Sequence, residues 1–490
     1  MGVLVDGRGV RAAQRARGPA AGAHRREHRA LKGNALVLAV VLLSSFTSPL
    51  TITGVSVALP DIRADLGAGL TASQWVITGY NACFASFLVA MGSLADVAGR
   101  RRVFAGGVAV FCATGLAAAA SQDVLTLNAV RVLGGVGAAA SATGGSAILA
   151  ATFHGTARVR AVGLLGTVLG AGLAFGPTVG GLLVETLGWR AAFGAPAALA
   201  GLVLLFVPRL PAGRGEPGRR IDWAGAALFT GALLALITSI VEGGERGFGA
   251  PLVLAGFVLA AALAAAFAAV ERRTDDPMFE LALLANRRFS SYAVAAGSIV
   301  FVLVPMLVYL PSYLISVVGL DAGEAGLWLL MLTAPTVVLP TAGAALAKRI
   351  PAGPLVAGSV AVTGAGALLL VTIGPGSTPW ALAVPLALTG AGFGLSTGLL
   401  DGLAVTAVRP EQAGTAAGMF STARLAAETI AIAVVGAALA VLSGDRLAGA
   451  HYTDALRVVC AALAVFAAVA TACVLALSRR PAGRGAVPGG

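Results

Sequence analysis

The segment from Gly92 to Arg102 reads GSLADVAGRRR and connects two apolar stretches, residues 73–95 and 103–120. Each stretch is close in length to the roughly 20 residues with which an α-helix crosses a bilayer. Glycines at 92 and 99 permit a tight turn between two helix ends, where a side chain would clash. Asp96 lies beside the arginines at a helix terminus, so it can form a charge-assisted contact with a neighbouring helix end. The residues that carry this prediction are Gly92, Asp96, Gly99, Arg100 and Arg101.

The whole chain is far more apolar than a water-soluble protein. Of its 490 residues, 58% are apolar and 11% are charged, and its mean hydropathy is +0.89. Soluble domains are about 45–50% apolar and about 25% charged. We therefore exclude a water-soluble enzyme and predict an all-α polytopic membrane protein. The fourteen predicted spans are 35–58, 73–95, 103–120, 124–148, 160–183, 190–207, 223–241, 251–270, 291–317, 323–346, 353–373, 380–405, 414–441 and 456–477.

Lysine and arginine are distributed unevenly between the two sides of the predicted membrane. With the N-terminus inside, 27 of the 34 basic residues fall in cytoplasmic segments and 5 in outer segments. Because basic loops stay on the cytoplasmic side, this excess predicts that both termini are cytoplasmic. It also explains the net charge of +12 without a nucleic-acid partner. The Ala, Gly and Arg bias is typical of a high-GC bacterial genome, so we expect a bacterial plasma membrane.

Two long polar stretches, residues 208–222 and 271–288, divide the predicted spans into groups of six, two and six. The turn at 343–349, GAALAKR, faintly repeats the small-residue and basic pattern of the segment described first. Parallel repeats of six spans build one large class of transporters, in which the substrate path runs between the halves. The predicted segments are a basic, disordered cytoplasmic tail (1–33), an N-terminal six-helix bundle (34–208), a linker with spans 7 and 8 (209–289), a C-terminal six-helix bundle (290–478) and a second cytoplasmic tail (479–490).

The sequence contains no arrangement of groups that is typical of catalysis or metal binding. All four cysteines lie inside apolar stretches, where they read as small buried hydrophobic residues. The four histidines are scattered through a tail and loops, and there is no nucleotide-binding loop. We therefore expect no enzymatic activity, no catalytic residues, no metal site and no cofactor.

A second distinctive motif, GLAFGPTVGG, occupies residues 172–181 in the fifth predicted span. A proline inside a helix removes one backbone hydrogen bond and kinks the helix, and glycines four residues apart allow close helix approach. Generic glycine-rich packing explains the four-residue spacing but not the added proline and glycine pair. We expect this helix to seal the outer side between the two bundles. The motif residues are Gly172, Gly176, Pro177, Gly180 and Gly181.

These motifs resemble signatures of the major facilitator superfamily. The segment 92–102 resembles the loop between spans 2 and 3, and 172–181 resembles the antiporter motif of the drug exporters in that superfamily. In the fourth span, RVLGGVG at 131–137 resembles a motif whose arginine is associated with proton transfer. Snorkelling of Arg131 to the outer surface is the alternative. Over residues 35–478, the chain is similar to the fourteen-span drug:proton antiporter family.

The resemblance implies a major facilitator fold of two six-helix bundles with two extra helices. It implies a monomeric secondary active exporter in a lipid bilayer, which moves a drug, antibiotic or similar amphiphilic molecule outward by alternating access. The proton gradient is then the energy source, and Asp96 with its arginines acts as a conformational latch. A metabolite importer of the same fold and a non-transporting membrane sensor are the alternatives.

The first span departs from that family, which often has an acid and an asparagine where this chain has Thr51 and Ser56. A proton carrier must then lie elsewhere. Ionisable residues inside spans are functional candidates, and the second half has three near mid-membrane. Arg424 and Glu428 are four residues apart on one helix face, so the alternative is that their charges simply neutralise each other. The three candidates are Asp401, Arg424 and Glu428, of which we favour Asp401. Arg131 of the fourth span is a further candidate for proton coupling.

Overall fold

The computed structural model describes residues 18–212, 222–274, 277, 279–409, 412–444 and 449–478, and these residues contain helices but no strands. The prediction of an all-α membrane protein is confirmed. The first half comprises α2 (Gly18–Leu66), α3 (Leu70–Ala98), α4 (Arg100–Ala119), α5 (Val124–Thr152), α6 (Gly155–Leu187), α7 (Ala191–Phe206) and η1 (Val207–Arg209). The middle segment comprises α8 (Trp223–Arg246), α9 (Pro251–Glu271) and η2 (Leu281–Ala285).

The second half is less regular than the first. Its elements are α10 (Arg287–Tyr313), η3 (Leu314–Val318), α11 (Ala322–Trp328), α12 (Leu330–Val338), α13 (Pro340–Leu346), α14 (Ala352–Leu369), η4 (Leu370–Thr372), α15 (Pro379–Ser396), α16 (Leu399–Thr406), α17 (Ala413–Ser443) and α18 (Gly449–Ser478). Thirteen helices among the described residues are long and apolar enough to span a membrane. The tenth predicted span, 323–346, is the short series α11–α13, which makes the structure consistent with fourteen spans.

Proline and glycine explain two of the interruptions in the second half. Pro335 lies inside α12 and Pro340 opens α13. Because proline lacks an amide hydrogen and its ring crowds the carbonyl four residues earlier, a helix with two prolines so close breaks into short pieces. The break between α15 and α16 lies at Gly398, whose φ of +76° is poorly accessible to other residues.

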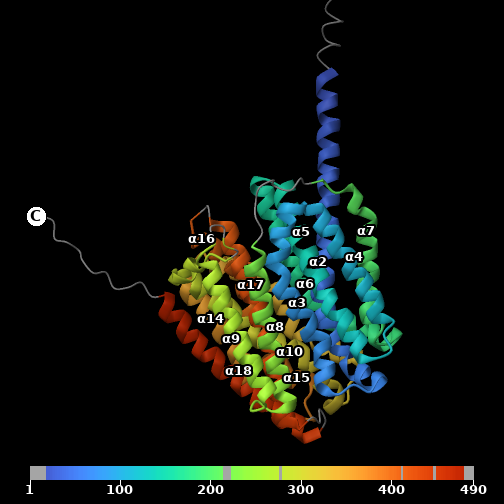
Figure 1. Ribbon diagram of the computed structural model, residues 1–490, viewed down its shortest axis with the longest axis vertical. Helices are drawn as coiled ribbons and strands as arrows, with labels where there is room; N and C mark the ends of the chain where they lie inside the picture. Colours follow the sequence, from blue (N-terminus) through green and yellow to red (C-terminus); the bar gives the residue numbers. More distant parts are fainter. Residues whose placement is uncertain are drawn as a thin grey trace, which may run out of the picture.

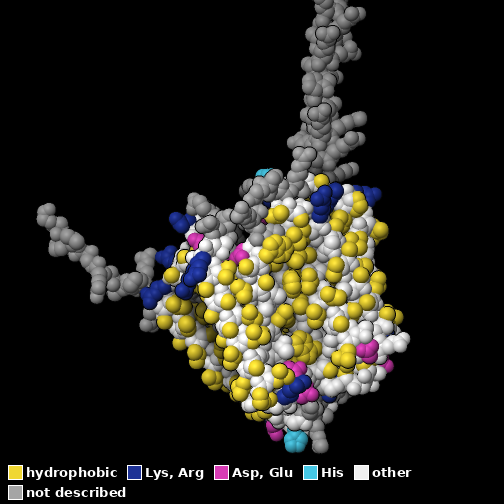
Figure 2. Space-filling view, in the orientation of Figure 1, with side chains coloured by type: hydrophobic (Ala, Val, Ile, Leu, Met, Phe, Trp, Pro, Cys, Tyr) yellow, Lys and Arg dark blue, Asp and Glu magenta, His cyan; other side chains and the backbone are white. Residues whose placement is uncertain are grey.

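The helices stand side by side, and α2 projects beyond the bundle on the side of Gly18 (Figure 1). Residues 18–33 form the start of α2 and residues 1–17 lie outside the described part, so the tail predicted for 1–33 stays a prediction. Hydrophobic side chains cover the flank, and basic and acidic side chains gather toward its two ends (Figure 2). That distribution fits a lipid-facing belt between two aqueous boundaries.

The two extra helices, α8 and α9, lie beside the line along which the first and second halves meet. α8 packs on α3 of the first half and on α17 of the second, and α9 packs on α8. Thr230 in α8 donates to the Ser86 carbonyl in α3 at 3.2 Å. Only 11% of the residues in the most apolar 18-residue stretch of α9 are buried, so α9 forms an outer layer. The exact limits predicted for the five segments stay a prediction.

Candidate functional site

The two halves meet along several helix pairs, among them α2 with α10, α6 with α11, and α3 with α17. In the first pair, Ser56 Oγ donates to the Leu307 carbonyl at 2.9 Å. In the second, Thr178 Oγ1 donates to the Gly326 carbonyl at 2.8 Å. In the third, Gln74 Nε2 donates to the Gly436 carbonyl at 3.1 Å. These contacts define the seam between the halves.

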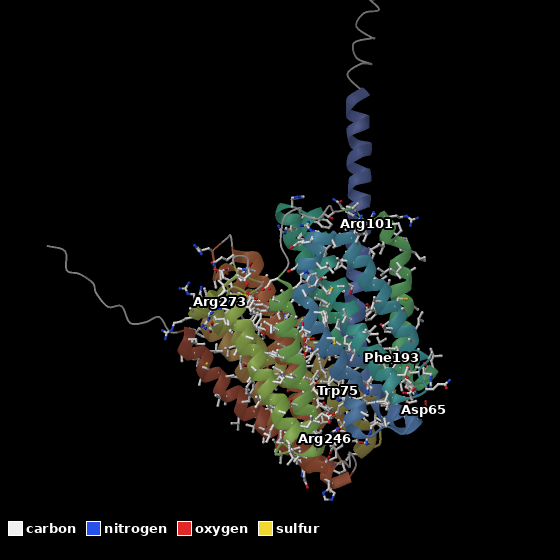
Figure 3. The ribbon with its side chains drawn as sticks, in the orientation of Figure 1. Asp65, Trp75, Arg101, Phe193, Arg246 and Arg273 are labelled. Carbon is white, nitrogen blue, oxygen red and sulfur yellow. The ribbon has the colours of Figure 1, made fainter. Side chains whose placement is uncertain are left out.

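All three of these bonds lie toward one end of the bundle. We call it the Leu66 end, where α2 is followed by α3, and the opposite one the Gly99 end, where α3 is followed by α4. Arg101 lies at the Gly99 end and Asp65 at the Leu66 end (Figure 3). A fourth bond across the seam, from Thr429 Oγ1 to the Asn81 carbonyl at 3.4 Å, lies midway along α3 and α17. The halves are thus joined at the Leu66 end.

Glycines of α6 permit close packing on two faces of the helix, one toward α2 of the same half and one toward the second half. A Cβ at Gly172 would lie 2.7 Å from the Phe46 carbonyl oxygen, and one at Gly180 would lie 2.5 Å from Gly54 Cα. A Cβ at Gly176 would overlap the Thr53 hydroxyl, so all three glycines pack against α2 of the same half. A Cβ at Gly181 would instead overlap the Ala322 carbonyl of the second half.

The proline of the same motif lies at the contact with α11. Pro177 is inside α6, and a Cβ at Gly326 would lie 2.5 Å from the Pro177 carbonyl oxygen. Thr178 next to it makes the hydrogen bond to Gly326 already described. The close helix approach predicted from the glycine spacing is therefore present. It places α6 in contact with both halves at once.

The segment 92–102 forms the turn between α3 and α4 at the Gly99 end. Gly99 caps both helices with a φ of +100°, which explains the glycine there. Close packing does not explain Gly92, because its Cβ would have no neighbour nearer than Thr143 at 3.9 Å, so the clash predicted there is wrong. Arg101 Nη1 donates to the Leu210 carbonyl at 3.1 Å, which ties the turn to the end of the sixth span. Asp96 and Arg100 flank the turn and are half-buried.

Arg131 in α5 is buried, with 4% of its surface exposed, so it does not snorkel outward. Its Nε donates to the Val76 carbonyl at 2.8 Å, and its guanidinium lies 4.1 Å from the Tyr80 ring centroid. Its Nη2 has no hydrogen-bond partner among the described residues. A small cavity beside it is also lined by Thr51. The residue that replaces the usual acid of the first span therefore faces the same space as this arginine.

The three charged candidates of the second half separate into a pair and a single residue. Arg424 Nη1 lies 3.5 Å from Asp401 Oδ1, and this ion pair joins α16 to α17. The side chain of Asp401 is 44% exposed and that of Arg424 is 28% exposed. Glu428 is only 8% exposed and occupies the middle residue of α17. Arg424 thus forms an ion pair with Asp401 across two helices, and it also interacts electrostatically with Glu428 on its own helix.

Glu428 lies next to the seam, because its neighbour Thr429 bonds to α3 at Asn81. The Asn81 amide is buried, and neither of its polar atoms has a hydrogen-bond partner among the described residues. A buried amide without partners is costly unless water or a ligand satisfies it. Our sequence reasoning missed Asn81, although an asparagine in the middle of an apolar span is itself a signal. The described residues contain no cluster of three or more metal-ligating side chains.

Two membrane-embedded helical halves, joined at one end over buried charged and polar groups, define an α-helical membrane transporter. The chain belongs to the Major Facilitator Superfamily, whose sequence model matches residues 41–432.

Two relatives are similar to this chain in sequence, and one solved structure is similar to it in fold. It is 33% identical to the multidrug resistance protein Stp of Mycobacterium tuberculosis over 391 residues, which cover 79% of this chain and 72% of that one. It is 34% identical to the puromycin resistance protein pur8 of Streptomyces alboniger over 406 residues, 81% and 80% of the two chains. A bacterial homologue of the human lysosomal transporter Spinster, solved in an inward-facing and unoccupied conformation, shares the fold with a TM-score of 0.64 at 16% identity, over 91% and 97% of the chains.

Proposed function

We propose that the chain is a proton-coupled exporter of an antibiotic, drug or similar amphiphilic small molecule. It acts as a monomer in the plasma membrane of a bacterium, with both termini in the cytoplasm. The observation that carries the proposal is a buried carboxylate, Glu428, at the middle of α17 beside the seam. A carboxylate in that position can take up a proton from one side and release it to the other. The relatives named for multidrug and puromycin resistance support the substrate class.

Alternating access follows from the positions of the contacts between the halves. With the Gly99 end in the cytoplasm, the bonds at the Leu66 end close the path to the outside. Rocking of the halves about the seam would break these bonds and open that side. The α6 motif sets this closure, because its small residues let α6 touch α2 and α11 together.

Three further groups have assigned roles in this proposal. The Asp401–Arg424 pair is half-exposed, so it can exchange partners as the cavity opens and is a second proton-coupling element. Arg131 holds a permanent positive charge in the first half and orients the substrate or its anionic groups. Asp96 with Arg101 forms a latch at the Gly99 end, which holds one conformation. The proton gradient supplies the energy, and the protein needs no cofactor and catalyses no chemical reaction.

Substrate-driven proton movement in inverted membrane vesicles tests the proposal. Acid-loaded vesicles that contain the protein are exposed in turn to puromycin, to cationic dyes and to natural-product antibiotics. An exporter releases protons from the lumen when its substrate is added, and vesicles without the protein do not. An importer of the same fold would accumulate substrate in right-side-out vesicles instead, and a sensor would bind a compound without any flux.

A further inference from the structure

A cavity of about 440 Å³ opens at the Gly99 end, where α10 and α14 begin and α18 finishes. One wall is formed by Arg287, Arg288, Ser291 and Tyr292 from the first turns of α10. The opposite wall consists of the start of α14 (351–354) and the last residues of α18. Ligand pockets in proteins occupy about 300–1,000 Å³, so the space is large enough for a small polar group. It lies outside the seam between the halves.

The charge of the cavity favours an anion. Two arginines are among its lining residues, and none of those residues is acidic. It also lies at the start of α14, an 18-residue helix whose first turn has no side-chain cap. The positive end of that helix dipole adds to the charge of the two arginines. At α10 the arginines alone contribute, because Asn286 already accepts hydrogen bonds from the Arg288 and Phe289 amides.

The position of the cavity favours an anion that is attached to an apolar chain. In the adjoining helix α18, only 33% of the residues in the most apolar 18-residue stretch are buried inside the protein. On that helix Leu475 is 36% exposed and Val469 is 64% exposed, so apolar surface continues from the cavity toward the middle of the membrane. Tyr292 is half-buried in the wall, as is common for aromatic residues at the membrane boundary.

We propose that this cavity binds the phosphate group of an anionic phospholipid, with the two arginines as its ligands. Basic pockets between spans at the cytoplasmic boundary suit such headgroups. Guanidinium groups match phosphate oxygens in a two-point geometry. The bound lipid joins α10, α14 and α18 at the Gly99 end, where the seam has to open and close. A free phosphate ion shares this chemistry but lacks the apolar chain.

The test uses the full-length protein in a neutral detergent, titrated with phosphatidylglycerol, with phosphatidylcholine or with inorganic phosphate. We expect phosphatidylglycerol to raise the melting temperature far more than phosphatidylcholine does. In the variant Arg287→Gln/Arg288→Gln, the phosphatidylglycerol concentration at half effect should rise about tenfold or more, since each basic group near an anionic lipid contributes to its binding. The matched control is Arg272→Gln/Arg273→Gln, which removes the same charge from exposed positions near the same end and outside the cavity.

Native mass spectrometry of the unmodified protein provides a measurement that does not depend on the stability of a variant. We expect a phosphatidylglycerol molecule to stay bound in the presence of excess phosphatidylcholine. An equal response of the two double variants would overturn the site, and equal retention of both lipids would overturn its selectivity. A response to inorganic phosphate as large as that to phosphatidylglycerol would assign the cavity to a free phosphate instead and would overturn the lipid.

Discussion

Each half of the molecule has an arginine within a membrane-spanning helix, Arg131 in α5 and Arg424 in α17, and these two lie in opposite surroundings. Arg131 of the first half is 4% exposed and is held by a backbone carbonyl and an aromatic ring, with no carboxylate among its described contacts. Arg424 of the second half is 28% exposed at its side chain and pairs with Asp401. Four residues further along α17, Glu428 is buried.

The different surroundings of Arg131 and Arg424 suggest to us that the two halves have different tasks. The first half combines a fixed positive charge with the glycine motif of α6 and the turn at Gly99. The second half holds the carboxylates of Asp401 and Glu428, which are the groups that we propose exchange protons. We infer that the first half mainly sets the closure of the molecule and that the second half carries the coupled proton. Exchanging or removing these features tests the division.

The largest effect is expected from Glu428→Gln, which keeps the shape of the side chain but cannot release a proton. Substrate-driven proton release from inverted vesicles should be abolished, whereas substrate binding should persist. The matched control is Glu242→Gln in α8, where the carboxylate is 24% exposed and pairs with Arg246 one turn further along the same helix. Release at the unmodified rate in Glu428→Gln would transfer the carrier role to Asp401.

The next effect is expected from Gly176→Ala in α6. The added Cβ would overlap the Thr53 hydroxyl, so the packing of α6 against α2 must shift. Overpacking of this kind costs typically about 1–3 kcal/mol. A lower melting temperature and slower transport should result. Gly170→Ala is the control in the same helix, because its Cβ meets nothing within 4 Å and the change should leave stability equal or higher. Equal behaviour of the two variants would remove the packing role of the motif.

A smaller effect is expected from Thr51→Asp, which gives the first half the carboxylate that it lacks. Thr51 lines the cavity beside Arg131, whose Nη2 is available as a donor. A carboxylate there would neutralise the arginine and reduce the repulsion of cationic substrates. Ethidium transport should rise several-fold relative to that of a neutral substrate. An unchanged ratio, in a variant that retains its melting temperature, would show that the charge of Arg131 does not act on the substrate.

The smallest effect is expected from Asp96→Asn at the Gly99 end. The substitution removes the charge of the latch without altering the glycine that forms the turn. Transport should slow a few-fold while substrate affinity stays the same, because the change alters the exchange between conformations and leaves the seam intact. Rates and affinities come from the same vesicle preparation. An unchanged rate would leave Arg101 and its bond to Leu210 as a purely structural contact.

Hydropathy and glycine spacing predicted much of the fold correctly. A span of about 20 apolar residues is a local property of the chain, so the helices could be located without knowing their neighbours. The contacts of Gly172, Gly176 and Gly180 with α2 follow from four-residue spacing, which places all three on one face. The positive φ of Gly99 likewise follows from its place between two helices.

The partners of charged residues depend on tertiary structure, so the sequence predicted these partners less well than it predicted the helices. Spacing along one helix suggested Glu428 as a partner of Arg424, but it could not show that the break at Gly398 starts a new helix that brings Asp401 to the same arginine. The clash expected at Gly92 is absent because α5 lies too far away at that point. The basic cavity was also unpredictable, since its walls come from three segments distant in sequence.

The most direct test of the division between the halves is the number of protons released per substrate bound. The purified protein is mixed in weakly buffered detergent solution with the compound that gives the largest vesicle flux, and a pH indicator records the release. We predict about one proton for the unmodified protein and for Arg131→Met, since the arginine stays charged throughout. We predict none for Glu428→Gln. Release that persists in Glu428→Gln but disappears in Arg131→Met would contradict the assignment of the proton to the second half.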